Sequence, residues 1–219
     1  LTVGQEVELV PAASTTRIRG LQTHRQKLDQ GQPGSRVAAN LAGIAHEDIS
    51  RGDVLTTPGW LKSTTALDVR LKIIPDAPRP LKHNTFATLH TGSSESVARV
   101  RLLDRQTAEP GESAWAQLKL DGPIGVVKGD YFVIRSNRTT LGGGSIVDPH
   151  ARRHRRMYAP ILERLAVMEK GSDRDVLLKS IEVSEPIEFN ELVNRANLEP
   201  AAARSALKAM AAERLVVIT

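Results

Sequence analysis

The first two thirds of the chain carry short runs of alternating apolar and polar residues, which predict β-strands. In the clearest run, over residues 66–73, every second residue is apolar: Leu67, Val69, Leu71 and Ile73. Turn residues such as Pro33-Gly34 recur about every 8–12 residues, the spacing typical of a small barrel or sandwich. We therefore predict a mainly β protein that begins with two tandem small β-barrels, over residues 1–65 and 66–150.

Near residue 150 the apolar period changes from two to 3.6, which predicts helices. The stretch Ser172-Asp173-Arg174-Asp175 resembles a capping box, and Pro200 falls in the first turn of a further helix. The apolar run at residues 215–218 indicates a closing β-strand. Helices followed by a strand are the order of a winged helix, so we predict a C-terminal α part with a winged-helix domain over residues 151–219.

Composition and charge narrow the possible functions. The chain has 219 residues, no cysteine, and 30 Lys and Arg against 25 Asp and Glu, for a net charge of +5. Without cysteine there is no disulfide, no thiolate zinc site and no cysteine nucleophile. No apolar run approaches the roughly 20 residues of a membrane span, so we expect no membrane partner and a cytoplasmic location. The start is strand-like and lacks an initiator methionine, which leads us to expect a piece of a longer protein.

The familiar catalytic motifs are missing from the sequence. Gly142-Gly143-Gly144 lacks the lysine of a phosphate-binding loop, and the six histidines form no His-Glu-x-x-His pair. No Gly-x-Ser-x-Gly nucleophile elbow occurs either. We therefore predict a binding function, with no catalytic residue and no metal site in this chain.

Basic residues are the stronger lead. Four arginines occupy five positions where the β region meets the helical region: Arg152, Arg153, Arg155 and Arg156. A guanidinium is always charged and makes paired hydrogen bonds to phosphate, so the run suits an anionic polymer, although a solvated linker is an equal alternative. Arg36 follows a Pro-Gly turn and opens an apolar strand, so we expect its head group at the rim of the first barrel.

Two stretches of the chain resemble translational GTPases of the elongation factor Tu type. Residues 31–43 and 49–55 are similar to their second domain, and residues 129–149 are similar to the end of their third domain. The triple glycine, the following Ile-Val-Asp-Pro and the arginine run are closest to one branch, the bacterial selenocysteine-specific elongation factors. That branch carries winged helices after the third domain, in agreement with the helical pattern.

The resemblance implies a translation elongation factor segment that binds selenocysteinyl-tRNA for selenocysteine incorporation at UGA codons. The ribosome and an mRNA hairpin are then further partners, the hairpin being reached through winged helices beyond this chain. GTP and Mg²⁺ would occupy a nucleotide-binding domain that this chain lacks. GTP hydrolysis therefore belongs to the complete factor, and we expect no cofactor in this segment.

The resemblance also implies roles for individual residues. Arg36 takes the position near the aminoacyl end of the tRNA, where a guanidinium favours the anionic selenol over a neutral serine hydroxyl. Thr140, Gly142 and Gly144 match a segment that faces the T-stem, and the four arginines of the run would add contacts to the tRNA backbone. A glycine run that merely closes the barrel is the alternative. His90, Arg99 and Arg101 could add phosphate contacts, but the sequence does not orient them.

Two other functions remain open at this point. One is a winged-helix DNA-binding regulator with a β ligand-sensing region, and the other is a protein-interaction scaffold in a translation complex. The sequence leaves undetermined the orientation of the barrels and the helical domain, the folding of the first barrel alone, the rest of the selenocysteine pocket and the oligomeric state.

Overall fold

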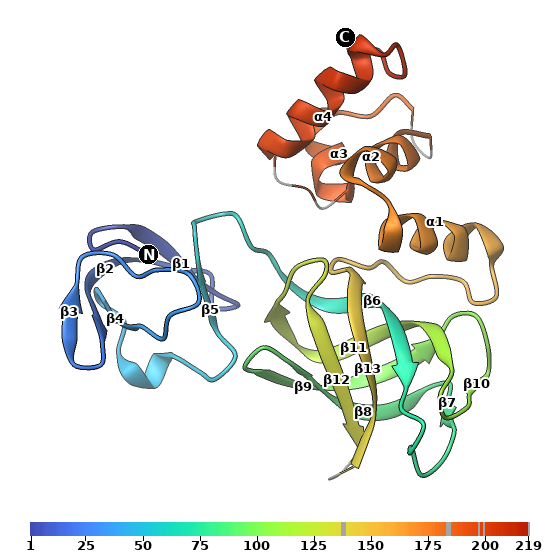
Figure 1. The fold of residues 1–219 in the computed structure, drawn as a ribbon, viewed down its shortest axis with the longest axis horizontal. Coiled ribbons are helices and arrows are strands. Elements are labelled where there is room, and N and C mark those ends of the chain that lie inside the picture. The colour runs from blue at the N-terminus through green and yellow to red at the C-terminus, as the bar shows by residue number, and fades with distance from the viewer. Residues whose placement is uncertain (137–138, 183–184, 197, 199, 219) are drawn as a thin grey trace.

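The structure is a computed structural model that describes residues 1–136, 139–182, 185–196, 198 and 200–218. Strands occupy the chain as far as residue 148, and helices follow them (Figure 1). The predicted change of architecture near residue 150 is thus confirmed. Within the described residues, no helix combines the length and the apolar character needed to cross a membrane.

The first β unit is a five-stranded antiparallel sheet with a small core. Its strands are β1 (Glu6–Val10), β2 (Ser14–Thr23), β3 (Gln26–Leu28), β4 (Ala38–Leu41) and β5 (Val54–Thr56). They run in the order β3-β2-β1-β5, with β4 also paired to β2, and a short 3-10 helix, His46–Asp48, precedes β5. Only Val7, Ile18 and Leu21 are fully buried in this unit's own cluster. We predicted a barrel for residues 1–65, but the strands described there form an open sheet with β3 and β5 at its ends. Strand alternation alone does not determine whether the end strands of a sheet pair.

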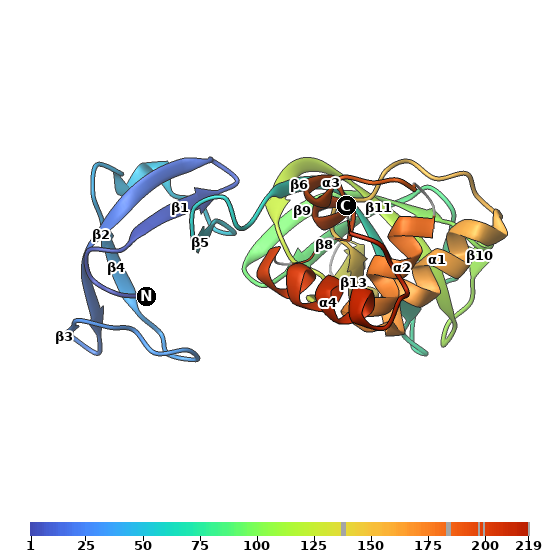
Figure 2. The same cartoon turned by 90° about the horizontal axis from the view of Figure 1, so that it is seen from above.

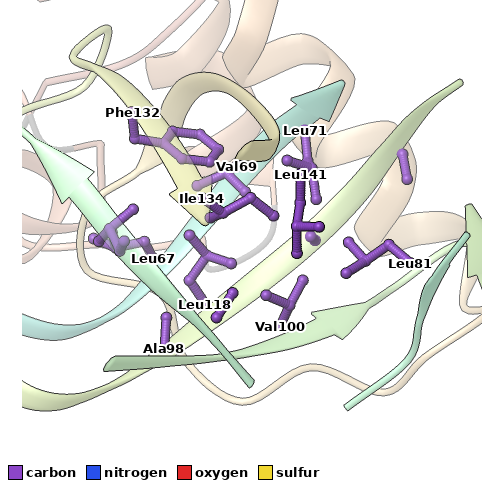
Figure 3. Packing of buried hydrophobic residues seen from close by; sticks show 14 of the residues in the cluster. Leu67, Val69, Leu71, Leu81, Ala98, Val100, Leu118, Phe132, Ile134 and Leu141 are labelled. Atoms are coloured by element: carbon purple, nitrogen blue, oxygen red, sulfur yellow. The ribbon is translucent and has the colours of Figure 1, made fainter. Parts of the chain in front are cut away.

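The second β unit is a closed barrel of six strands in the order β11-β6-β13-β12-β8-β9. Their bounds are β6 (Ser63–Ile73), β8 (Thr85–Thr91), β9 (Ser94–Leu102), β11 (Ser113–Gly125), β12 (Tyr131–Ser136) and β13 (Thr139–Asp148). The pairing of β9 with β11 completes the circle. Two short strands, β7 (Leu81–Lys82) and β10 (Thr107–Ala108), pair beside it. The residues predicted for one face of the run 66–73 point inward with Val100, Leu118 and Ile134 (Figure 3).

The triple glycine lies inside β13, where the barrel backbone is tightly spaced. A Cβ on Gly142 would lie 2.4 Å from the carbonyl oxygen of Lys72, and one on Gly144 would lie 1.8 Å from that of Arg70. Distances this short exclude any side chain at these positions unless the strands separate. The glycines therefore have a packing role between β6, β13 and β12, and they do not form a turn.

The helix α1 (Ala159–Lys170) packs on the barrel. Its Leu165 and Met168 are buried against Trp115 and Val147 of the strands and against Leu103, which follows β9. The guanidinium of Arg70 lies 4.7 Å from the centre of the Trp115 ring and adds a cation–π contact. We predicted residues 151–219 as one domain, but α1 packs on the outside of the barrel in a cluster separate from that of α2–α4.

The helices α2 (Asp173–Glu182), α3 (Phe189–Ala196) and α4 (Pro200–Ala212) form a separate cluster above α1 (Figure 1). The predicted capping box is present, since Ser172 and Asp175 each bond the other's backbone N–H through their side chains. The predicted strand at residues 215–218 is wrong. Those residues form no ladder in the described structure, and Val217 is 89% exposed. A strand needs a paired neighbour, and within the described part of residues 151–219 none is formed. Helices in the predicted order are present, and the winged helix stays a prediction.

The open sheet and the barrel lie next to each other and are joined by the linking segment (Figure 2), and a hydrogen bond connects them near it. The Ser94 hydroxyl donates to the carbonyl oxygen of Gly52 at 2.9 Å. On the barrel side, Gly125 lies close to Val10 and Leu61, both of which are buried. The two β units are therefore joined by contacts as well as by the chain.

Candidate nucleic-acid interface

Strand register collects basic side chains on the outer face of β9 and β11. The two strands are antiparallel, and Lys119 lies opposite Arg99 while Gln117 lies opposite Arg101. Their neighbours Val100 and Leu118 point into the core, so the basic residues must point outward. The alternation that builds the barrel thus also produces a basic surface.

This surface is hollowed. A cavity of about 550 Å³ is lined by Thr65, Ala66, His83, Asn84, Arg99, Arg101, Gln117, Lys119, Arg153 and Arg156. Five of these residues are Lys or Arg and none is Asp or Glu. We call this cavity the basic hollow. Its size and charge suit the phosphates of a nucleic-acid backbone, which guanidinium groups bind with paired hydrogen bonds.

The segment after β13 folds back over the barrel and completes one wall of the basic hollow. His154 is buried there, and its Nε2 lies 2.5 Å from Oδ2 of Asp68, a β6 residue with no exposed surface. Gln117 donates to Oδ1 of Asp68 at 3.1 Å and to the carbonyl oxygen of Arg152 at 2.8 Å. These bonds hold the arginine run against the barrel, so a solvated linker is not what the structure shows.

Arg156 has a structural role in the same wall. Its Nε donates to the carbonyl oxygen of Leu102 at 2.6 Å, and its Nη2 donates to that of Arg105 at 2.6 Å and to Gln106. Two of these three hydrogen bonds therefore go to backbone acceptors. Arg99, Lys119 and Arg153 are exposed and present their charge to solvent.

Electrostatic repulsion within the basic hollow favours an anionic ligand. Burial lowers the pKa of Arg101, and the nearby charges of Arg153, Arg156 and Arg99 lower it further. Burial also lowers the pKa of His83, again with contributions from Arg156 and Arg101. A bound phosphate would relieve the repulsion among these cations.

Buried carboxylates lie behind this surface. Desolvation raises the pKa of Asp68, an effect opposed by the hydrogen bond and charge of His154. Asp148 is also buried, and its Oδ2 accepts from Arg164 of α1 at 3.0 Å. The described residues contain no group of three or more His, Cys, Asp or Glu that could hold a metal ion.

The structure brings together only some of the predicted site residues. Arg153 and Arg156 line the basic hollow, together with Arg99 and Arg101. Arg152 and Arg155 are exposed beside it, and Arg155 lies 6.0 Å from the ring of Tyr158. The roles predicted for these arginines remain predictions.

The other predicted residues lie elsewhere. Thr140, Gly142 and Gly144 belong to β13 and are not among the residues that line the hollow, and Gly142 is buried. Arg36 lies in the first β unit, where its side chain is exposed and its carbonyl oxygen accepts from the Thr23 hydroxyl at 2.8 Å. The strand expected to start at Arg36 begins at Ala38. The contacts predicted for these four residues with tRNA stay predictions.

Sequence reasoning did not find His83, Lys119, or the buried trio of Asp68, Gln117 and His154. Lys119 could have been found from the alternation of residues 115–120, since it lies between two inward-facing leucines and must therefore point out of the barrel. The trio could not, because Asp68 and His154 are 86 positions apart and meet only through the barrel closure.

Comparisons with known proteins agree with this architecture. Residues 68–153 match the model of the selenocysteine-specific elongation factor β-barrel domain, and residues 1–56 match elongation factor Tu domain 2. An open β unit, a closed barrel and a helical extension in this order define part of a translation elongation factor.

A curated relative carries the identification one step further. The chain is 34% identical over 186 residues to the selenocysteine-specific elongation factor of Desulfomicrobium baculatum. The match covers 84% of this chain and 29% of that relative's length. The chain belongs to the selenocysteine-specific elongation factors, as the matched barrel domain and this relative together indicate.

Proposed function

We propose that this segment binds the backbone of selenocysteinyl-tRNA through the basic hollow and so supports selenocysteine incorporation at UGA codons. The observation that carries the proposal is the collection of five Lys and Arg residues around one cavity with no carboxylate among its lining. Because the chain belongs to the selenocysteine-specific elongation factors, we take the anionic ligand to be a tRNA. An RNA ligand also accounts for the location of the site on a rigid barrel wall, since phosphate contacts require fixed donors.

Several wider features belong to the same proposal. Arg36, being exposed, is available to the aminoacyl end of the tRNA, where its charge would favour a selenolate. GTP and Mg²⁺ would act in another part of the complete factor. The ribosome and an mRNA hairpin as partners, and a cytoplasmic location, follow from the family and not from the geometry of this chain.

The experiment is a titration of the 219-residue chain with fluorescently labelled tRNA at several salt concentrations. Arg101→Ala and Lys119→Ala should each weaken binding about tenfold, as expected for the loss of one charge-assisted hydrogen bond. Each should also reduce the slope of log affinity against log salt by about 0.7–0.9 if one phosphate contact is lost.

The matched control is Lys179→Ala, which removes one positive charge from α2 at an exposed ion pair with Glu182. It should change the affinity less than twofold. Equal weakening by all three variants would mean that net charge alone attracts the tRNA and that the basic hollow is not the site. Preference for duplex DNA over tRNA would instead favour the DNA-binding regulator, and absence of RNA binding would favour the interaction scaffold.

A further inference from the structure

The guanidinium of Arg101 is held in place by a neutral group. Its Nη1 donates to Oε1 of Gln117 at 2.6 Å. Gln117 is only 3% exposed, and both ends of its amide are engaged. A carboxylate in the same place would also hold the arginine, but it would cancel the charge that a phosphate needs.

Gln117 is oriented by a buried network behind it. Its amide nitrogen donates to Asp68 and to the carbonyl oxygen of Arg152, which leaves the amide oxygen facing Arg101. Asp68 is held in turn by His154. The three strands β6, β11 and β9 place Asp68, Gln117 and Arg101 in one row, because Gln117 pairs with both of the others.

The network keeps the carboxylate of Asp68 out of direct contact with the arginines of the basic hollow. Asp68 has no exposed surface, and among the described residues its two oxygens bond His154 and Gln117 and no arginine, so its charge acts on Arg101 only across Gln117. Arg101 is therefore fixed without an ion pair of its own. A fixed and unneutralised guanidinium loses less conformational entropy on binding a phosphate than a mobile one.

We infer that Gln117 is a positioning residue that aims Arg101 at an RNA phosphate in the basic hollow, with Asp68 and His154 setting the direction of its amide. The inference rests on the proposed function, because it assumes that the hollow binds RNA. It assigns a role in binding to three buried residues, of which Gln117 lines the hollow while Asp68 and His154 are not among its lining residues.

A double-mutant cycle on the 219-residue chain tests the inference. Gln117→Leu keeps the volume and removes all three hydrogen bonds of the Gln117 amide, and it should weaken tRNA binding about fivefold. Arg101→Ala should weaken it about tenfold, and the combined variant should equal Arg101→Ala within twofold, because Gln117 acts only through Arg101. A Gln117→Leu effect that persists in full in the Arg101→Ala background would overturn the inference.

A second variant covers the case in which Gln117→Leu does not fold. His154→Phe retains a ring and removes the bond to Asp68, and its effect on tRNA affinity should likewise vanish in the Arg101→Ala background. The matched control is Ser96→Ala. Ser96 lies on the same strand as Arg101, and the substitution removes a buried hydroxyl that donates to Asp121 of β11. It should leave the affinity within twofold.

NMR of the arginine side-chain N–H groups in the tRNA-free chain separates the two possible failures. If Arg101 gives a slowly exchanging signal that Gln117→Leu abolishes, the positioning is real, and an unchanged tRNA affinity of Arg101→Ala then refutes only the proposed function. If Gln117→Leu leaves that signal unchanged, the positioning role fails even where the hollow binds tRNA.

Discussion

Replacing Gly144 by alanine tests whether the triple glycine serves packing or RNA contact. A Cβ at this position would lie 1.8 Å from the carbonyl oxygen of Arg70, whereas a carbon and an oxygen in contact are normally about 3.3–3.6 Å apart. The strands β6 and β13 would therefore have to separate by roughly 1.5 Å, a large fraction of the ~4.8 Å spacing between paired strands. Such a displacement disrupts the ladder where Gly144 faces Leu71.

The size of the effect follows from two contributions. Losing two ladder hydrogen bonds costs about 2 kcal/mol, at about 1 kcal/mol net for each bond. Overpacking adds about 1–3 kcal/mol. We expect Gly144→Ala to lower the free energy of unfolding by about 3–5 kcal/mol, a large part of the roughly 5–15 kcal/mol typical of a folded domain.

Urea unfolding followed by tryptophan fluorescence measures this loss. Trp115 is 8% exposed between the barrel and α1 and reports on the barrel, while Trp60 is already 56% exposed. The expected lowering of the midpoint is about 2 M urea. The matched control is Gly122→Ala in β11, where a Cβ meets no atom within 4 Å. That variant should change the stability by less than about 1 kcal/mol.

The packing explanation is refuted if Gly144→Ala unfolds within about 1 kcal/mol of the wild type. A variant of normal stability that had lost tRNA binding would support the alternative role, in which the glycine lets the T-stem backbone approach closely. Reduced stability with unchanged tRNA affinity at low denaturant would assign the glycine to the barrel alone.

Two further predictions concern the docked helix and the titration of the hollow. Leu165→Ala should destabilise the barrel together with α1 by about 2–5 kcal/mol, because Leu165 is buried against strand residues; calorimetry in which only the α2–α4 unit lost stability would contradict this. Burial keeps the pKa of His83 in the folded state below its ordinary value of 6.5. Its contribution to the free energy of unfolding is therefore present above pH 6.5 and is lost as the pH falls toward the folded-state pKa. His83→Gln should accordingly remove part of the loss of stability on acidification. Denaturation midpoints between pH 7.5 and pH 5 that decline equally in both proteins would contradict it.

Much of the fold was predictable because it depends on local periodicity. The alternation of residues 66–73 assigned the inward face of β6 correctly, and Pro200 and the Ser172–Asp175 box marked helix starts that the structure confirms. The strand expected at residues 215–218 failed because an apolar run states only a preference. A strand forms only when another backbone is present to pair with it.

The candidate site was only half predictable for a similar reason. Arg153 and Arg156 were predicted as binding residues because four arginines occur within five positions, which the sequence shows directly. Their convergence with Arg99, Arg101 and Lys119 required the register of β9 against β11 and the return of the segment after β13. The arginine run also contains two different roles, because the backbone carbonyls of Leu102 and Arg105 engage Arg156 while Arg153 stays exposed.

By itself, the sequence determined the succession of strands and helices, the inward face of each clear strand, the helix caps and the family resemblance. These depend on residues that are close along the chain or on motifs that can be read directly. Tertiary structure alone decided that the second β unit closes and that α1 packs on the outside of the barrel. It placed β13 too close to β6 for any side chain at Gly142 or Gly144. It also decided that Asp68 meets His154 behind Gln117. Contacts between distant residues depend on the register and closure of the whole barrel, which no local pattern specifies.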